Sequence, residues 1–295
     1  MAFNWQTFRT RTLTAVVFVA VMLTGLLWNH WSFLILFSII HFGCWWEYLK
    51  LTEKIHQTVF HAYTKLGLML MGYGLMIWFC SPGYNIQGYG LKTNFSLPLT
   101  AAGFVLVLIG IFQKNAIKLK SFYAAALGIV YISMSWGMMI SLYRPYEIVY
   151  DSILPDLSTP FIPIIIILSI WINDTMAYIS GSLIGKTPLS KISPKKTWEG
   201  TISGIILSVV LIGTLASLGF GRSEKHIFLL ILYIISAIAS ITGTFGDLLE
   251  SKLKRLAGVK DSSSLMPGHG GFLDRFDSLL LATPFVWLYI TITMH

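Results

Sequence analysis

The strongest constraint in this chain is a series of apolar runs long enough to cross a lipid bilayer. A membrane-spanning helix needs about 20 predominantly apolar residues, and this 295-residue chain is 55% hydrophobic and 12% charged. We predict about nine such helices, over residues 12–28, 31–49, 64–80, 96–113, 122–143, 161–185, 201–220, 227–246 and 276–294. The predicted fold class is all-α, a polytopic integral membrane protein, because backbone in lipid has to satisfy its own hydrogen bonds.

Short polar segments shape the expected topology. Only Asn29 and His30 separate the first two runs, which predicts a tight helical hairpin. The stretch 144–163 contains four prolines and is expected to be a stiff loop. Arg9 and Arg11 precede the first run as in a signal peptide, but no small-residue cleavage site follows. We therefore expect that run to remain as the first membrane helix.

The composition excludes several classes of protein. The hydrophobic content does not fit a disordered chain or an ordinary soluble enzyme. Two cysteines, Cys44 and Cys80, lie in apolar runs and do not form a disulfide framework, so we expect buried free thiols. The net charge of +8 fits nucleic acid, anionic lipid or the cytoplasmic loops of a membrane protein.

The distribution of basic residues separates these alternatives. With nine spans, 17 of the 21 Lys and Arg residues fall on the side that holds the N-terminus and the even-numbered loops. The other four are Lys92, Arg144, Arg222 and Lys225. The positive-inside rule then predicts an N-in, C-out topology. It also explains most of the charge without a nucleic-acid partner.

The acidic residues are scarce, and seven of the 13 lie on or near the predicted cytoplasmic face of the C-terminal half. These seven are Asp174, Glu199, Asp247, Glu250, Asp261, Asp274 and Asp277. Three more, Glu147, Asp151 and Asp156, lie in the predicted external loop, where we expect solvated side chains. The acids near Lys50 and Lys225 are interpreted as ordinary loop residues.

Asp174 lies inside a strongly apolar run, where an ionisable group costs at least ~2.5 kcal/mol. Helical spacing places it on one face with Tyr178 and Ser182, which we expect to point into the bundle or a watery cavity. An interhelical hydrogen bond is the structural alternative. The following segment, 185–200, carries basic and hydroxyl side chains that suit phosphate, although a plain positive-inside loop is slightly favoured for it alone.

The densest polar region is 247–277. Asp247, Glu250, Ser251 and Lys254 form one stripe on a helix, which fits either a site or an interfacial amphipathic helix. A glycine-rich turn follows at 267–271, and its backbone N–H groups suit a phosphate at the start of the next helix.

Carboxylates flank this turn. Asp274 and Asp277 are one helical turn apart and can share a hard cation such as Mg²⁺, with Asp247 in reach if the two helix ends are adjacent. His269 is more readily interpreted as a phosphate contact than as a ligand of such an ion. The order of these residues predicts a nucleotide-phosphate site.

At these residues the sequence resembles the phosphatidate cytidylyltransferases (CDP-diacylglycerol synthases). The family motif stands here as Ser251, Lys254, Arg255, Lys260, Asp261, Ser263, Pro267, His269, Gly270, Gly271, Asp274, Arg275 and Asp277. The run 193–200 and the pair Asn173-Asp174 are also similar. The resemblance is strong over about 165–280 and weak over the first 150 residues. It implies N-terminal membrane helices in 1–150 and a catalytic membrane region in 151–295.

The resemblance implies a reaction in which phosphatidate and CTP give CDP-diacylglycerol and pyrophosphate. It implies Mg²⁺ and a second cation such as K⁺, a homodimer, and a site facing the cytoplasm at the bacterial inner membrane. The implied metal ligands are Asp247, Asp274 and Asp277. The implied catalytic residues are Asp174, Lys254, Asp261, His269 and Arg275. The implied substrate-binding residues are Lys195, Lys196, Ser251, Gly270 and Gly271.

Three other functions are alternatives for a membrane protein of this composition. An ion-coupled transporter with Asp174 as a relay is disfavoured, because the ionisable groups gather at one predicted face. A CDP-alcohol phosphotransferase needs a D-G-x2-A-R motif that the chain lacks. A cytidylyltransferase acting on an isoprenoid ether-lipid phosphate stays open, because the motif contacts the phosphate end of the lipid rather than its tails.

Overall fold

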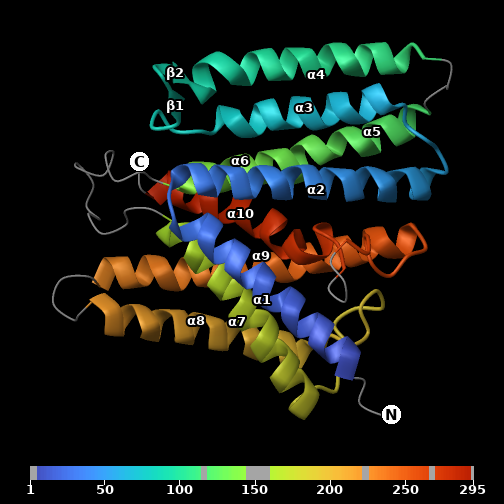
Figure 1. The fold of residues 1–295 in the computed structure, drawn as a ribbon. Helices are drawn as coiled ribbons and strands as arrows, with labels where there is room; N and C mark the ends of the chain where they lie inside the picture. The colour runs from blue at the N-terminus through green and yellow to red at the C-terminus, as the bar shows by residue number, and fades with distance from the viewer. Residues whose placement is uncertain (1–4, 114–117, 144–159, 221–225, 266–269, 294–295) are drawn as a thin grey trace. The chain divides into compact units, whose positions relative to one another are not determined.

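The computed structural model describes residues 5–113, 118–143, 160–220, 226–265 and 270–293 (Figure 1). The helices in these ranges are α1 (Trp5–Leu27), α2 (His30–His56), α3 (Ala62–Trp78), α4 (Ser96–Ile111), α5 (Leu119–Gly128), α6 (Ser135–Leu142), α7 (Phe161–Ile184), α8 (Trp198–Phe220), α9 (His226–Leu256) and α10 (Leu273–Thr293). Two π-helical segments, η1 (Leu91–Phe95) and η2 (Ile129–Met134), continue into α4 and join α5 to α6. A short hairpin of β1 (Asn85–Ile86) and β2 (Tyr89–Gly90) is the sheet in the described ranges.

The predicted fold class is confirmed, since the described chain is built from long apolar helices. Seven helical stretches are long and apolar enough to cross a membrane: His30–His56, Leu91–Ile111, Leu119–Leu142, Phe161–Ile184, Trp198–Leu218, Phe228–Leu256 and Leu273–Thr293. The other two predicted spans also fall in helices, but the apolar part of α1 (Thr12–Leu27) and the 17-residue α3 are shorter. The protein is a multi-pass membrane protein, and the count of nine spans stays a prediction.

The helical hairpin predicted at Asn29 is confirmed. The Asn29 side chain accepts a hydrogen bond from the backbone N–H of Ser32 at 2.8 Å, and the Ser32 hydroxyl accepts one from the N–H of Asn29 at 3.0 Å. This capping box satisfies two N–H groups at the start of α2, those of Asn29 and Ser32. The chain therefore turns between α1 and α2 within two residues.

The predicted proline-rich loop lies mostly outside the described residues, which resume at Pro160. Its predicted end at residue 163 is wrong, because α7 begins at Phe161 and includes Pro163. Proline is tolerated in the first turn of a helix, where its missing N–H has no partner to lose. The prediction for the cysteines is confirmed, since Cys44 and Cys80 are buried free thiols.

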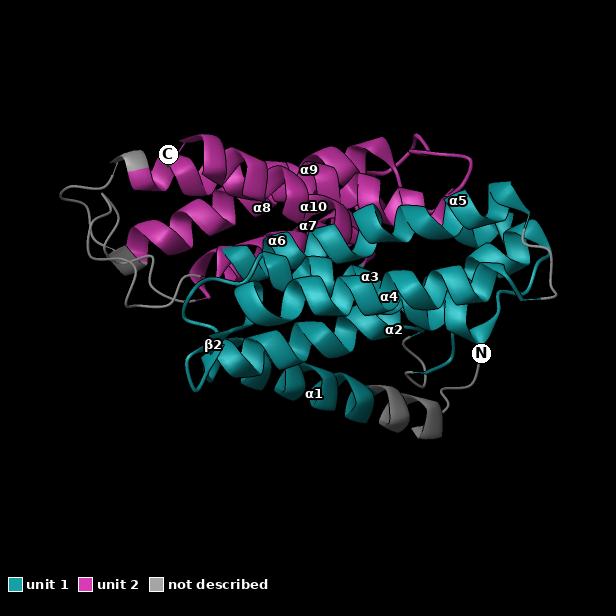
Figure 2. Ribbon diagram, turned by 90° about the horizontal axis from the view of Figure 1, so that it is seen from above, with its two compact units in different colours: residues 1–141, 253–276 teal, residues 142–252, 277–295 magenta. Residues whose placement is uncertain are grey.

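The chain forms two compact units (Figure 2). Unit 1 comprises residues 1–141 and 253–276, and unit 2 comprises 142–252 and 277–295. The division falls within α9 and within α10, so each unit takes part of both helices. The sequence-based division at residue 150 stays a prediction, but the units do not follow a single cut in the chain.

Aromatic packing and buried polar groups hold unit 1 together. The ring centroids of Phe37 on α2 and Trp136 on α6 are 5.1 Å apart, and both side chains are fully buried. The indole of Trp45 donates to the hydroxyl of Ser133 at 2.8 Å. A Cβ at Gly67 on α3 would lie 2.6 Å from the carbonyl oxygen of Gly103 on α4, so these helices touch through their backbones. Small residues permit this approach in membranes.

Buried hydroxyl groups connect the helices of unit 2. The hydroxyl of Ser208 on α8 donates to the backbone carbonyl of Ser169 on α7 at 2.8 Å. The hydroxyl of Ser240 on α9 donates to Ser208 at 3.1 Å. Such interhelical hydrogen bonds stabilise helix packing where hydrophobic burial cannot distinguish protein from lipid. They fix α7, α8 and α9 as the frame for the polar residues that follow.

Candidate active site

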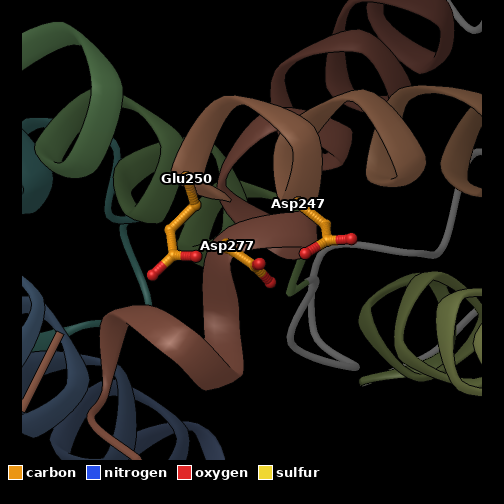
Figure 3. A group of neighbouring side chains, drawn as sticks. All are labelled: Asp247, Glu250 and Asp277. Atoms are coloured by element: carbon orange, nitrogen blue, oxygen red, sulfur yellow. The ribbon is translucent and has the colours of Figure 1, made fainter. Parts of the chain in front are cut away.

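Three carboxylates of unit 2 converge on one point (Figure 3). Asp247 and Glu250 come from α9, and Asp277 comes from α10. One carboxylate oxygen from each lies within 4.8 Å of the others. Glu250 and Asp277 are buried, while Asp247 is half-buried. Buried like charges this close repel, and a hard cation relieves that repulsion, so the group fits an ion such as Mg²⁺.

A glycine lets the two helices bring these carboxylates together. A Cβ at Gly246 on α9 would lie 2.6 Å from the carbonyl oxygen of Asp277 and 3.0 Å from the Cα of Ser278. Any larger residue would push α9 and α10 apart within unit 2 at the level of the acids. The close approach of Gly246 therefore positions Asp247 opposite Asp277.

Lys196 brings positive charge to this group. Its ammonium forms an ion pair with Asp247. Burial alone would lower the pKa of Lys196, but the carboxylates of Asp247 and Asp174 outweigh it and raise the pKa above its ordinary value. Lys196 therefore stays charged at neutral pH.

The segment that carries Lys196 is held in place by hydrogen bonds. The carboxylate of Glu199 accepts from the backbone N–H groups of Lys186 at 3.2 Å and Thr187 at 3.1 Å. An antiparallel bridge joins Pro188 to Thr197. Lys195, beside Lys196, is exposed. The loop is thus a folded element in which Lys195 is exposed and Lys196 is half-buried.

Asp174 is exposed on α7 rather than packed between helices. Its charge acts on Lys196, together with that of Asp247. Of the neighbouring residues on its helix, Tyr178 is also exposed, while Asn173 is buried and donates to the hydroxyl of Thr244 at 3.3 Å. Asn173 therefore makes the interhelical bond that was the structural alternative for Asp174.

In unit 1, Asp274 is surrounded by donors. Its carboxylate accepts from the ammonium of Lys254 at 2.6 Å and from the backbone N–H of Gly271 at 2.8 Å. It also accepts from the backbone N–H of Ser262 at 2.9 Å, and the Ser262 hydroxyl lies 2.8 Å from it. Gly270 has a φ of +82°, and a Cβ there would lie 2.6 Å from Asp274. Glycine at this position lets the turn fold onto the carboxylate.

Glu47 is the functional candidate that the sequence interpretation missed. It lies three residues before Lys50, and its assignment as an ordinary loop residue is wrong, because it is fully buried in α2. Its carboxylate accepts hydrogen bonds from Ser262, Ser263 and the first turn of α10. The signal was available: Glu47 falls inside the predicted span 31–49, where an acid is costly unless it has partners.

The remaining predicted site residues differ in their exposure. Asp261 and Arg275 are exposed, and Ser251 is half-buried. His269 lies outside the described residues. The structure thus brings together Asp247, Asp277 and Lys196 in unit 2, and joins Lys254, Asp274 and Gly271 in unit 1. Glu250 is added to the first set and Glu47 to the second.

Comparison with known proteins assigns the chain to a family. The sequence model of the cytidylyltransferase family matches residues 9–293. The chain belongs to the cytidylyltransferase family. The resemblance seen in 165–280 is therefore confirmed, and it extends through the N-terminal helices where the motifs gave little indication.

Bacterial relatives in this family carry the name phosphatidate cytidylyltransferase. One from Staphylococcus saprophyticus is 32% identical over 278 residues, covering 94% of this chain and 96% of that protein. One from Haemophilus influenzae is 30% identical over 299 residues, with the same coverage. One from Bacillus subtilis is 44% identical over 124 residues, which is 42% of this chain and 45% of that protein. Similarity thus spans nearly the whole chain and is higher over a shorter stretch.

Proposed function

We propose that this chain is a phosphatidate cytidylyltransferase, which transfers CMP from CTP to phosphatidate and releases pyrophosphate. The observation that carries the proposal is 32% identity to a relative of that name along nearly the full length of both chains. In the reaction, an oxygen of the lipid phosphate forms a bond to the α-phosphorus of CTP. The bond from that phosphorus to the bridging oxygen breaks, and pyrophosphate leaves.

Asp247, Glu250 and Asp277 are proposed to hold a divalent cation such as Mg²⁺. Their carboxylate oxygens are the ligand type that this ion prefers, and their mutual distances fit one ion. A bound Mg²⁺ would supply positive charge to the phosphates of CTP. A second cation such as K⁺ is part of the proposal by family resemblance.

The cationic residues are proposed to bind and orient the phosphates. Lys196 is held by Asp247 and stays protonated, and Asp174 helps to keep that charge in place. Lys195, which is exposed, is proposed to contact the lipid phosphate. Fixed positive charges of this kind stabilise the charge that develops during phosphoryl transfer.

The glycine-rich turn is proposed to bind the triphosphate. The backbone of Gly270 and Gly271 approaches the phosphates, with Lys254 and Arg275 steadying their charge. Ser251, Asp261 and His269 are proposed by resemblance to orient these groups. Asp274 is ion-paired with Lys254, so we propose that it positions this lysine, and its role as a metal ligand stays a prediction.

The proposed setting is a bacterial inner membrane with an N-in, C-out topology, the site at the cytoplasmic face, and a homodimer. A reporter fused after His295 is expected to give the non-cytoplasmic signal. A cytoplasmic signal would contradict the nine-span topology.

The test of the function is an assay of the purified chain with radiolabelled CTP and phosphatidate, with and without Mg²⁺. We expect labelled CDP-diacylglycerol and equimolar pyrophosphate that both depend on Mg²⁺. A parallel arm supplies an isoprenoid ether-lipid phosphate, and a preference for that lipid would favour the other acceptor. Absence of product with either lipid, from protein that is monodisperse, would contradict the proposed activity.

A further inference from the structure

The carboxylate of Glu47 gathers four donors that lie more than 200 residues away in the sequence. The hydroxyls of Ser262 and Ser263 donate to it at 2.7 and 2.6 Å. The backbone N–H groups of Phe272 and Leu273 donate to it at 3.0 and 2.8 Å. All these residues belong to unit 1, and Glu47 is 0% exposed. These four hydrogen bonds to one buried carboxylate connect α2 to the segment before α10 and to the start of α10.

The two backbone donors stand at the start of α10. The first N–H groups of a helix have no partner within it, and the helix dipole places positive charge there. Glu47 supplies both the acceptor and the negative charge from a different helix. This contact fixes where α10 begins and therefore where Asp274, in its first turn, is held.

Ser262 links Glu47 to Asp274. Its hydroxyl lies 2.7 Å from the Glu47 carboxylate and 2.8 Å from that of Asp274. A Cβ at Gly271 would collide with both Glu47 oxygens and with the Ser262 hydroxyl, so the backbone of the turn lies directly on this network. Displacing Glu47 would shift both the Gly271 N–H and the ion pair of Asp274 with Lys254.

The surface of α2 around Glu47 is shaped for this segment. One turn earlier stands Gly43, where a Cβ would lie 2.5 Å from the ring of Phe272. Phe272 thus packs against α2 while its N–H donates to Glu47. Gly43 and Glu47 together form a surface on α2 that contacts both the Phe272 ring and the backbone of the turn.

We propose that Glu47 is a positioning residue for cytidylyl transfer, holding Ser262, Gly271 and Asp274 so that Lys254 is presented in a fixed place. This inference rests on the proposed function and extends it to a residue in the N-terminal helices. Glu47 acts through the turn and does not itself contact the substrates. Replacing Glu47 should therefore change kcat and the KM for CTP more than the KM for phosphatidate.

The kinetic test compares Glu47→Gln with Glu53→Gln in the purified full-length protein. Glu53 is a matched control, because it lies on the same helix, accepts from the N–H of Phe60 at 2.7 Å and pairs with Lys65 at 2.8 Å. We expect Glu47→Gln to lower kcat per folded enzyme by about tenfold or more, with a higher KM for CTP and an unchanged KM for phosphatidate. Glu53→Gln should keep the wild-type kcat and both KM values.

A purely structural role predicts a different result. In that case less Glu47→Gln protein would fold, but the folded fraction would have wild-type kcat and KM, and the proposal would be wrong. If Glu47→Gln does not fold, Ser263→Ala removes one of the four bonds and should still lower kcat by about threefold. Wild-type kcat in folded Ser263→Ala would then overturn the proposal.

A measurement without substrate separates this inference from the proposed function. Hydrogen exchange of the backbone amides at 271–273 should accelerate in Glu47→Gln and stay at the wild-type rate in Glu53→Gln. Unchanged exchange in Glu47→Gln would overturn the positioning role. Inactivity of the wild-type protein with CTP and phosphatidate would instead overturn the proposed function.

Discussion

The acidic residues of the two units are arranged in opposite ways. In unit 1, Glu47 accepts from hydroxyl and backbone N–H groups, and Asp274 accepts from backbone N–H groups and the ammonium of Lys254. In unit 2, Asp247, Glu250 and Asp277 lie within 4.8 Å of one another, with Lys196 paired to Asp247. A carboxylate surrounded by donors holds backbone in place, whereas carboxylates that face one another favour a cation. On this difference we base the proposal that the acids of unit 1 position the turn and that those of unit 2 bind an ion.

The largest expected effect is at the acids of unit 2. Asp277→Asn removes a negative charge from the group of three, and we expect product formation to fall on the order of 10²- to 10³-fold. The Mg²⁺ concentration for half-maximal activity should also rise. Chelation of divalent cations should abolish wild-type activity. Full activity after chelation would contradict the cation site.

Asp274→Asn sharpens the comparison between the two units. We expect a fall in kcat of about 10- to 100-fold, because Lys254 and Ser262 lose a charged partner. The shift in Mg²⁺ dependence should be smaller than that of Asp277→Asn. An equal shift in both variants would assign Asp274 to the metal ligands, and unimpaired turnover would exclude both roles.

Lys196→Met tests the lysine that forms an ion pair with Asp247, and we expect activity to fall about tenfold. The carboxylates of Asp247 and Asp174 raise the pKa of Lys196 above its ordinary value of 10.5. The stability that its charge contributes is therefore present at neutral pH and is lost only as the pH rises through that raised value. Wild-type thermal stability, measured against Lys196→Met, should keep this increment between about pH 7 and pH 9.

A larger side chain at Gly246 should have the smallest effect on activity among these substitutions. Gly246→Val would force the α9 backbone away from Asp277, and we expect a cost of about 1–3 kcal/mol in stability with a severalfold loss of activity. Phe245→Ala is the control, since the Phe245 side chain is 59% exposed. Equal thermal stability of Gly246→Val and wild type would show that the helices do not need this close approach.

Sequence patterns predicted the helices well because apolar length alone defines a membrane helix. They also placed Asp247 and Asp277 at one site, because Asp277 falls in a motif with many fixed positions and Asp247 directly follows the preceding predicted span. Glu250 was placed on the correct helical stripe, but its burial beside Asp277 depends on the contact between α9 and α10 at Gly246. Such contacts between helices have no local sequence signal.

Glu47 shows the other limit of sequence interpretation. It stands far from the motif in sequence, so spacing could not connect it to Ser262 or Leu273. Only the burial cost of an acid at the end of a predicted span pointed to a partner. The end of the proline-rich loop was misplaced for a simpler reason. A proline in the first turn of a helix, such as Pro163, cannot be distinguished by residue type from a proline in a loop.

The central claim is that the acids of unit 2 support cytidylyl transfer to phosphatidate with a divalent cation. Its most direct test is a Mg²⁺ titration of CDP-diacylglycerol formation by purified wild type and Asp277→Asn. The account predicts that the wild type forms product with a saturable dependence on Mg²⁺. It predicts that the variant is folded, is far less active and needs a higher Mg²⁺ concentration for half-maximal activity. Equal activity and equal Mg²⁺ dependence of the two proteins would contradict it.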